Sequence, residues 1–343
     1  MEKICVLGAG SWGTALAALL AKNGNPVALW GRAEDGVELI AQLRENQQFL
    51  PGIHIPDGVN PTADMAAALE GANWIVLSIP SQGLRSVLEA AHKYINPGQI
   101  IINTAKGLEI SSGMRMSQVT EAVLGTGVRD SYAVLSGPSH AEEVALELPT
   151  AVAVAASRQE TAVRVQDLFM SPTFRVYTNP DVAGVELGGT LKNVIALATG
   201  VAYGLGYGDN TMAALLTRGL TEMIRMGAAL GGNPSTFSGL SGIGDLVVTC
   251  GSRHSRNRRA GELIGAGLTL EETLQRIGMV VEGAHTCKVV YKMAGEMGIE
   301  MPITRACYQV LYENRDPQQA VNNLMQRQKK HETEEIAVTL KGW

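Results

Sequence analysis

The chain has 343 residues, 45% hydrophobic and 18% charged, so it is long enough for two folded domains and has an ordinary globular composition. Its 28 basic and 33 acidic residues give a net charge of -5, which excludes the general basic footprint of a nucleic-acid-binding protein. Four scattered cysteines without a CxxC pair, and no apolar stretch near the roughly 20 residues that span a bilayer, predict a cytoplasmic protein without a metal site, disulfides or integral membrane segments.

Short apolar runs alternate with amphipathic segments through the first half of the chain. Strands are predicted at Lys3–Leu7, Pro26–Trp30, Trp74–Ile79, Gln99–Asn103, Tyr132–Ser136, Ala151–Ala155 and Phe174–Tyr177. Helical patterns fall between several of them, at Ser11–Asn23, Ala33–Gln47, Ser81–Tyr94 and Met114–Leu124. This alternation predicts an α/β fold with a doubly wound, mostly parallel sheet covered by helices on both faces.

The pattern changes at Asn179–Pro180, because a proline removes a backbone donor and disfavours helix in the residue before it. Helices are then predicted at Asp181–Tyr203, Thr211–Leu230, Arg256–Ala266, Thr269–Ile277, His285–Met297 and Pro302–Glu313. We therefore expect a sheet domain over residues 1–179 and an all-α domain over 180–343. The charged stretch 326–335 is interpreted as a solvated tail.

A glycine-rich turn joins the first predicted strand to the first predicted helix, with the sequence Gly8-Ala9-Gly10-Ser11-Trp12-Gly13. In a GxGxxG turn Gly8 permits a tight bend, Gly10 lets the backbone approach a pyrophosphate, and Gly13 allows the helix to pack on the strand. Amides around Ser11 and Trp12 would face the phosphates at the positive end of the helix dipole. The strand before and the helix after make this a Rossmann-type dinucleotide site, which indicates a nicotinamide-dependent dehydrogenase.

The end of the second strand bears on the choice of cofactor. An acidic residue there would bind the ribose 2′-hydroxyl of NAD(H), whereas an arginine accommodates the 2′-phosphate of NADP(H). Arg32 comes first in that place and favours NADP(H), while Glu34 keeps NAD(H) open. A plain surface charge is the competing interpretation of Arg32.

Three further segments suit an anionic substrate. Asn103–Leu108 and Ser136–Ala141 each follow a predicted strand, at the end where doubly wound folds bind ligands. Ser252–Arg259 concentrates arginines before a helix, and arginine forks with helix-start amides suit phosphate oxygens. Taken alone, such a basic run is more often a solvated surface turn.

Lys192 lies in a helical segment that is otherwise apolar and rich in small residues. Its side chain would either extend to a surface or sit in a cleft, and the segment alone favours neither. In a cleft close to Lys106, burial and like charge would lower its pKa, which suits a general base.

Together these segments resemble the bacterial-type NAD(P)-dependent sn-glycerol-3-phosphate dehydrogenase family. The resemblance runs in order over nearly the whole chain, through Gly8–Gly13, Ala105–Glu109, Ser136–Ala145, Glu186–Asn193, Gly239–Leu246, Ser255–Arg258, Val281–Gly283 and Met301–Thr304. It implies a Rossmann domain followed by a helical domain, a homodimer, and a role in supplying glycerol 3-phosphate for phospholipid synthesis.

The resemblance also implies roles for individual residues. Cofactor contacts fall on Gly8, Gly10, Ser11, Trp12, Gly13, Arg32, Lys106, Ala141, Arg256, Val280 and Glu282. Substrate contacts fall on Lys106, Gly137, Ser139, Lys192, Asp245, Thr249, Ser255, Arg256 and Asn257. Lys192 would be the proton acceptor, with Lys106 and Asp245 as catalytic partners. His140 stands where many relatives carry an aromatic residue, so packing is its expected role, and residues 333–343 match no motif.

Two other functions remain to be weighed. One is a reductase with the same two domains that acts on a hydroxy acid or sugar acid. Such an enzyme would not need the Ser255–Asn257 turn, which suits a phosphate group. The other is a noncatalytic dinucleotide sensor that binds a protein through its helical domain, which would leave Lys106 and Lys192 without a purpose.

Overall fold

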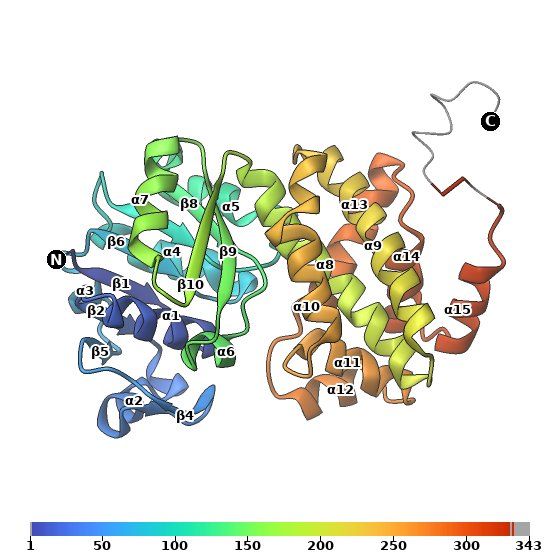
Figure 1. Cartoon of the computed structure of the whole chain (residues 1–343), viewed down its shortest axis with the longest axis horizontal. Coiled ribbons are helices and arrows are strands. Elements are labelled where there is room, and N and C mark those ends of the chain that lie inside the picture. The colour runs from blue at the N-terminus through green and yellow to red at the C-terminus, as the bar shows by residue number, and fades with distance from the viewer. Residues whose placement is uncertain (1, 330, 333–343) are drawn as a thin grey trace.

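The computed structural model describes residues 2–329 and 331–332 and has two lobes, a sheet lobe and a helical lobe (Figure 1). The main sheet has eight strands in the order β10-β9-β8-β7-β6-β1-β2-β5. Their bounds are β1 Ile4–Leu7, β2 Val27–Trp30, β5 Val59–Thr62, β6 Trp74–Leu77, β7 Ile100–Asn103, β8 Tyr132–Ser136, β9 Thr150–Ala156 and β10 Phe174–Asn179. Every neighbouring pair is parallel except β8 and β9, which confirms the mostly parallel α/β fold.

Helices cover both faces of this sheet. They are α1 Ser11–Lys22, α2 Val37–Leu43, α3 Met65–Leu69, α4 Leu84–Ala91, α5 Met116–Leu124, α6 Ala141–Ala145 and α7 Gln159–Phe169. Successive β1 side chains point to opposite faces, so Ile4 and Val6 pack with α1 and α7. Cys5 and Leu7 pack with α4 and α5 on the other face. Because both faces are buried, the strand is a continuous apolar run.

The segment predicted as one helix over Ala33–Gln47 is broken instead. After α2 the chain turns at Arg44, whose φ of 53° ends the helix, and β3 (Glu45–Asn46) pairs antiparallel with β4 (Leu50–His54). The Arg44 guanidinium donates hydrogen bonds to the carbonyls of Val59 and Ile55 at 2.9 and 3.1 Å. These hydrogen bonds keep Arg44 in a left-handed backbone conformation, at a position where the sequence pattern predicted that the helix continues.

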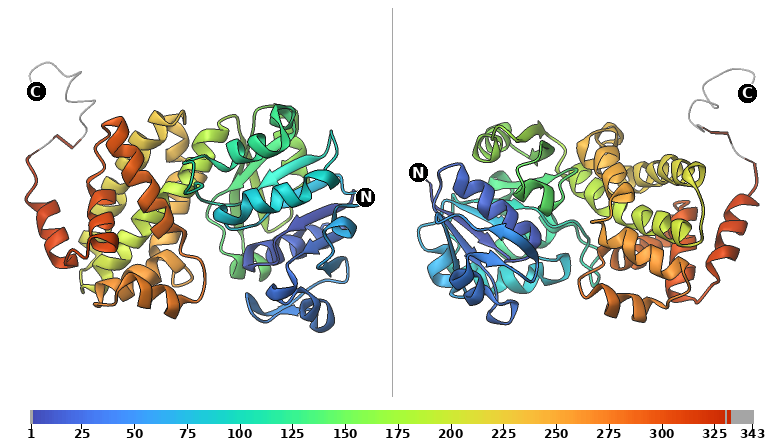
Figure 2. Two further views of the ribbon diagram at one scale, coloured as in Figure 1. Left: turned by 180° about the vertical axis from the view of Figure 1, so that it is seen from behind. Right: turned by 60° about the horizontal axis from the view of Figure 1, so that its bottom comes forward.

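In its described residues the second lobe contains helices joined by turns and no strand. They are α8 Val182–Gly204, α9 Asp209–Ala229, α10 Asp245–Gly251, α11 Arg256–Gly265, α12 Leu270–Ile277, α13 Glu282–Met297, α14 Pro302–Tyr312 and α15 Pro317–Met325, and they lie together in both views of Figure 2. α8 is buried along most of its length, and α11 packs closely on it because a Cβ at Gly200 would lie 2.1 Å from the Arg258 carbonyl oxygen. Among the described residues, no helix has both the length and the apolar character needed to cross a bilayer.

The first turns of α8 pack against the sheet lobe. Val185 is part of the apolar cluster on the α4 and α5 face of the sheet. The buried carboxylate of Glu186 accepts hydrogen bonds from Arg115 Nη1 at 2.8 Å, the Ser117 amide at 2.7 Å and the Tyr132 hydroxyl at 2.7 Å. The sheet ends at Asn179 and α8 begins at Val182, while the exact division into domains of residues 1–179 and 180–343 stays a prediction.

Candidate active site

The turn between β1 and α1 has backbone geometry that requires glycine at two positions. Gly8 has φ of 116°, and a Cβ there would lie 2.4 Å from the Ser78 carbonyl oxygen. A Cβ at Gly13 would lie 1.9 Å from the Gly8 carbonyl oxygen, so only glycine lets α1 start this close to the strand. At Gly10, by contrast, a Cβ would meet no atom within 4 Å. The turn is therefore tightly packed behind and open at Gly10.

The N-terminus of α1 is left uncapped by the protein. Gly10 is the N-cap, no side chain accepts a hydrogen bond from the first amides, and the first turn contains no acidic residue. Ser11 and Trp12 are half-buried at this end. Free amides at the positive end of a helix dipole, with open space beside Gly10, fit the diphosphate of a dinucleotide.

Arg32 lies just past β2, where sequence analysis expected it to face the cofactor ribose. Its guanidinium binds the Asp35 carboxylate through two hydrogen bonds of 2.8 Å, and Nη1 lies 3.2 Å from Glu34 Oε1. The side chain is exposed at 58%. A 2′-phosphate at this position would compete with Asp35, and the preference for NADP(H) stays a prediction.

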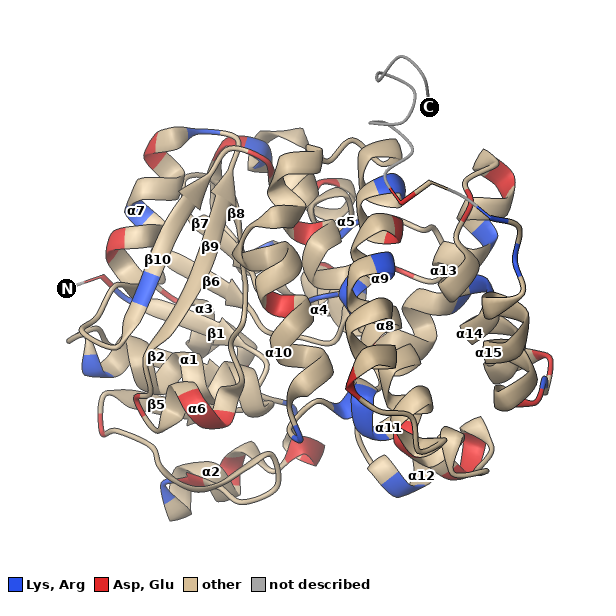
Figure 3. Ribbon diagram, turned by 45° about the vertical axis from the view of Figure 1, so that its right-hand side comes forward, with Lys and Arg blue, Asp and Glu red and all other residues tan. Residues whose placement is uncertain are grey.

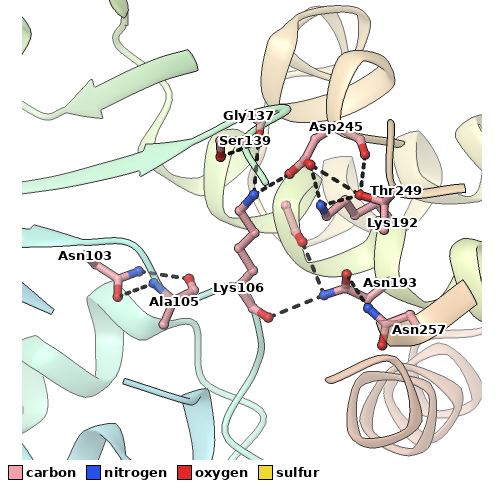
Figure 4. Close-up of polar contacts among 11 residues, drawn as sticks. Asn103, Ala105, Lys106, Gly137, Ser139, Lys192, Asn193, Asp245, Thr249 and Asn257 are labelled. Atoms are coloured by element: carbon pink, nitrogen blue, oxygen red, sulfur yellow. Dashed lines mark hydrogen bonds and ion pairs between the residues drawn. The ribbon is translucent and has the colours of Figure 1, made fainter. Parts of the chain in front are cut away.

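Two lysines from different lobes converge on one buried carboxylate (Figure 4). Lys106 follows β7, and its ammonium group donates to Asp245 Oδ2 at 2.8 Å and to the Gly137 carbonyl at 3.0 Å. Lys192, in the middle of α8, donates to Asp245 Oδ1 and to Thr249 Oγ1, the latter at 2.7 Å. Asp245 and Thr249 lie one turn apart on α10. The three residues expected to be catalytic, Lys106, Lys192 and Asp245, thus meet at the junction of the lobes.

Burial sets the protonation of this cluster. Only 5% of Lys192 is exposed, and burial lowers the pKa of its ammonium group to about 7, an effect that Asp245 opposes and Lys106 reinforces. Burial alone would raise the pKa of Asp245, but the two ammonium groups outweigh it and hold that pKa below its ordinary value. The cluster therefore pairs an ionised carboxylate with a lysine that can exchange a proton near neutral pH.

Side-chain amides hold the segments around the cluster in place. Asn103 Oδ1 accepts a hydrogen bond from the Ala105 amide at 3.1 Å, which shapes the turn before Lys106. Asn193 Nδ2 lies 3.4 Å from the Lys106 carbonyl oxygen, and Asn193 Oδ1 accepts from Asn257 Nδ2 at 2.9 Å. Asn257 thus connects the start of α11 to the segment that carries Lys106.

The start of α11 is strongly basic, as its blue ribbon in Figure 3 shows, because three of its first four residues are arginines. Ser255 is the N-cap, and its hydroxyl accepts a hydrogen bond from the Arg258 amide at 3.2 Å. Arg256 is exposed, and the Glu282 and Glu142 carboxylates act on its charge without a hydrogen bond to its guanidinium among the described contacts. Its guanidinium is therefore available for an anion beside the first two amides of α11, those of Arg256 and Asn257.

The other expected contact residues differ from one another in burial and in hydrogen-bond partners. The Ser139 hydroxyl donates to the Gly137 carbonyl at 3.0 Å, and Ala141 is buried at the start of α6. Val280 is 36% exposed in the loop before α13. Glu282 accepts hydrogen bonds from the Ser81 amide and hydroxyl at 3.0 and 2.8 Å, so in this structure it links the two lobes.

His140 lies at the N-cap of α6. Its Nε2 is buried without a hydrogen-bond partner among the described residues, and its ring centroid lies 5.7 Å from that of His254. Burial, reinforced by Lys192, lowers the pKa of His140. The packing role expected for His140 stays a prediction.

Sequence reasoning overlooked residues that organise the site rather than react. Asn193 was noted only as the neighbour of Lys192, and Ser81 and Glu186 were given no role. A side-chain amide next to a lysine in an apolar helix, or a carboxylate within such a helix, could have pointed to these residues. Buried polar groups need hydrogen-bond partners, so each predicts a specific contact. Within the described residues no group of three or more His, Cys, Asp or Glu side chains could hold a metal ion.

Comparisons with known proteins show which family the chain is similar to. Residues 3–162 match the family described as NAD-dependent glycerol-3-phosphate dehydrogenase N-terminus, and residues 181–322 match the corresponding C-terminus. The chain is 65% identical over 343 residues to a glycerol-3-phosphate dehydrogenase [NAD(P)+] of Syntrophomonas wolfei, covering all of both chains. The crystal structure of glycerol-3-phosphate dehydrogenase from Coxiella burnetii is 40% identical with a TM-score of 0.90, covering 95% of this chain and 99% of that one. The Saccharomyces cerevisiae enzyme is 29% identical with a TM-score of 0.80, covering 95% and 99%.

Proposed function

Because the chain belongs to the NAD-dependent glycerol-3-phosphate dehydrogenase family and is an NAD(P)-binding oxidoreductase, we propose that Lys192 moves the proton in its reaction. The reaction interconverts sn-glycerol 3-phosphate and dihydroxyacetone phosphate. The observation that carries the proposal is the burial of Lys192 at the lobe junction, with a pKa lowered to about 7 and Asp245 and Thr249 holding its ammonium group.

In the oxidative direction, the neutral amine of Lys192 accepts the proton of the C2 hydroxyl. Bound NAD(P)+ supplies the hydride acceptor for C2, and NAD(P)H supplies the hydride in reverse. For reduction, the ammonium form of Lys192 donates its proton to the carbonyl oxygen. Lys106 stabilises negative charge that develops on that oxygen, and Asp245 orients both ammonium groups.

The phosphate of the substrate would bind at the start of α11. Arg256 offers a guanidinium there, and Ser255 caps the Arg258 amide, which leaves the Arg256 and Asn257 amides of the first turn for the phosphate. Asn257 is held between Asn193 and the Gly283 amide, which fixes the direction of this turn relative to Lys106. Gly137 and Ser139 would border the glycerol carbons on the other side.

For the cofactor, we propose that the diphosphate binds at Gly8–Gly13 through the open side of Gly10 and the free amides of α1. Arg32 would release the Asp35 carboxylate and bind the 2′-phosphate instead. Ala141, Val280 and Glu282 would lie beside the nicotinamide. We also propose a cytoplasmic homodimer that supplies glycerol 3-phosphate for phospholipid synthesis. These proposals are supported by the family resemblance, and the described cysteines, all buried and free, are compatible with a reducing compartment.

The experiment compares Lys192→Ala with Arg256→Ala, using dihydroxyacetone phosphate and NADPH. Lys192→Ala should lower kcat about 100- to 10,000-fold, the range for loss of a general acid or base. Arg256→Ala should mainly raise the KM for dihydroxyacetone phosphate, about ten-fold or more, because it removes a charged hydrogen-bond donor to phosphate.

Exposed residues of the same types serve as controls for this experiment. Lys292→Ala on α13 and Arg276→Ala on α12 should leave both constants unchanged. A folded Lys192→Ala protein with near wild-type kcat would refute the proton-transfer role. An unchanged KM in Arg256→Ala would refute the phosphate site.

A further inference from the structure

Behind the dinucleotide turn, one buried side chain from the β3–β4 hairpin reaches its backbone. Asn46 is 1% exposed, and its Nδ2 donates to the Ala9 carbonyl at 2.9 Å and to Thr14 Oγ1 at 2.8 Å. Its Oδ1 accepts a hydrogen bond from the Phe49 amide at 3.1 Å, which orients the carboxamide within its own hairpin. One side chain thus ties the hairpin to both the turn and α1.

The contact with Ala9 controls the direction of a neighbouring amide. The Ala9 carbonyl and the Gly10 N–H belong to one planar trans peptide, so they point in opposite directions. Because the carbonyl is held toward Asn46, the Gly10 N–H is directed to the other side of the turn. The turn also leaves room at Gly10 itself, where a Cβ would meet no atom within 4 Å outside its chain neighbours.

Apolar packing makes the hairpin a firm support for this hydrogen bond. Leu50 of β4 is 1% exposed and clusters with Ala15 of α1 and Ala141 of α6. The hairpin therefore contacts the first helix and the α6 segment on which a cofactor contact is proposed. A rotation of the Ala9–Gly10 peptide would break a buried hydrogen bond and leave the Asn46 amide with Thr14 Oγ1 as its remaining acceptor.

We propose that Asn46 is a positioning residue for cofactor binding: by holding the Ala9 carbonyl, it presets the Gly10 amide toward the dinucleotide diphosphate. The proposal rests on dinucleotide binding at Gly8–Gly13. It assigns to the β3–β4 hairpin the function of a support behind the turn, so that the amide needs no reorientation when the anion arrives.

The test measures NADPH dissociation constants in the absence of substrate for Asn46→Ala, the isosteric Asn46→Asp, Thr14→Val and Asn23→Ala. Asn23 is the matched control, because it ends the same helix and its carboxamide also donates to two acceptors, the Leu168 and Met170 carbonyls, at 3.1 and 3.2 Å. Asn46→Ala should raise the dissociation constant about ten-fold, and Asn46→Asp at least as much because it sets an acceptor against the Ala9 carbonyl.

Thr14→Val and Asn23→Ala should stay within about two-fold of wild type in NADPH affinity, even where their melting temperatures fall. At saturating NADPH, kcat and the KM for dihydroxyacetone phosphate should stay nearly unchanged in Asn46→Ala. The proposal is overturned if both Asn46 variants bind NADPH like wild type, or if Asn23→Ala weakens binding equally. If Asn46→Ala does not fold, Asn46→Asp decides. Wild type that binds NADPH without turnover would contradict the proposed reaction and leave this test intact.

Discussion

Replacing the carboxylate between the two lysines should move the pH dependence of the reaction in a direction set by charge. Lysine in water has a pKa of 10.5, whereas that of Lys192 is lowered to about 7. At pH 7 about half of the Lys192 side chains are then neutral, compared with about 3 in 10,000 for an exposed lysine. The difference corresponds to about 5 kcal/mol against the ionised form in its buried site.

Asp245→Asn removes the charge that favours the Lys192 ammonium, so the pKa should fall further, by about one to three units for a charge pair at this separation. Lys106→Met removes a like charge, so the same pKa should rise. In kcat/KM for sn-glycerol 3-phosphate oxidation, followed by NADPH absorbance from about pH 5.5 to about pH 9.5, the wild-type rate should increase up to about pH 7 and then level.

The acidic limb of this profile should move to lower pH in Asp245→Asn and to higher pH in Lys106→Met, although both variants should also lose absolute activity. The opposite directions of the two shifts provide the internal control. Nonspecific damage to the site would lower the rate without shifting the acidic limb of the two variants in opposite directions. A limb that stays in place in both variants, or shifts the same way in both, would refute the assignment of this titration to Lys192.

Two further predictions concern stability and cofactor choice. Burial raises the pKa of Glu222 from 4.5 to about 7, so the stability linked to its proton is present below pH 4.5 and lost as pH rises through 7. In urea unfolding, Glu222→Gln should therefore gain about 3 kcal/mol relative to wild type between those pH values, and parallel pH profiles would contradict this. Arg32→Ala should raise the KM for NADPH about ten-fold or more and leave that for NADH nearly unchanged. Equal effects on both cofactors in steady-state kinetics would show that Arg32 does not read the 2′-phosphate.

The fold was predictable where strands are buried on both faces, because their apolar runs are continuous. β5 was missed because it is an edge strand whose residues Val59–Thr62 alternate in burial and include Pro61, which a central strand would not tolerate. The helix expected over Ala33–Gln47 ends early because Arg44 is held in a left-handed conformation by carbonyls 11 and 15 residues away. No local pattern carries that information.

The set of site residues named from the sequence stays a prediction, and the way those residues pack together could not be read from the sequence. Lys192 and Asp245 are 53 residues apart, and Ser81 and Glu282 are 201 apart, so their contacts follow only from how the lobes pack. The apolar segment around Lys192 was equally compatible with an exposed end and a cleft. The packing of α8 against both lobes decides this, since it leaves the lysine 5% exposed beside Asp245.

The fastening of α8 to the sheet has a consequence for how this protein can be divided. Val185 packs in the apolar core of the sheet lobe, and the Glu186 carboxylate accepts hydrogen bonds from Arg115, Ser117 and Tyr132. Both residues nevertheless follow the last strand of the sheet in the sequence. A fragment that stopped at Asn179 would expose the apolar surface that Val185 covers and leave the half-buried Arg115 guanidinium and the buried Tyr132 hydroxyl without their carboxylate partner. The sheet lobe as a packed unit therefore includes the first turns of α8, which lie beyond its last strand. A chimera of related enzymes should keep its reaction centre intact only if the crossover point lies outside the start of α8.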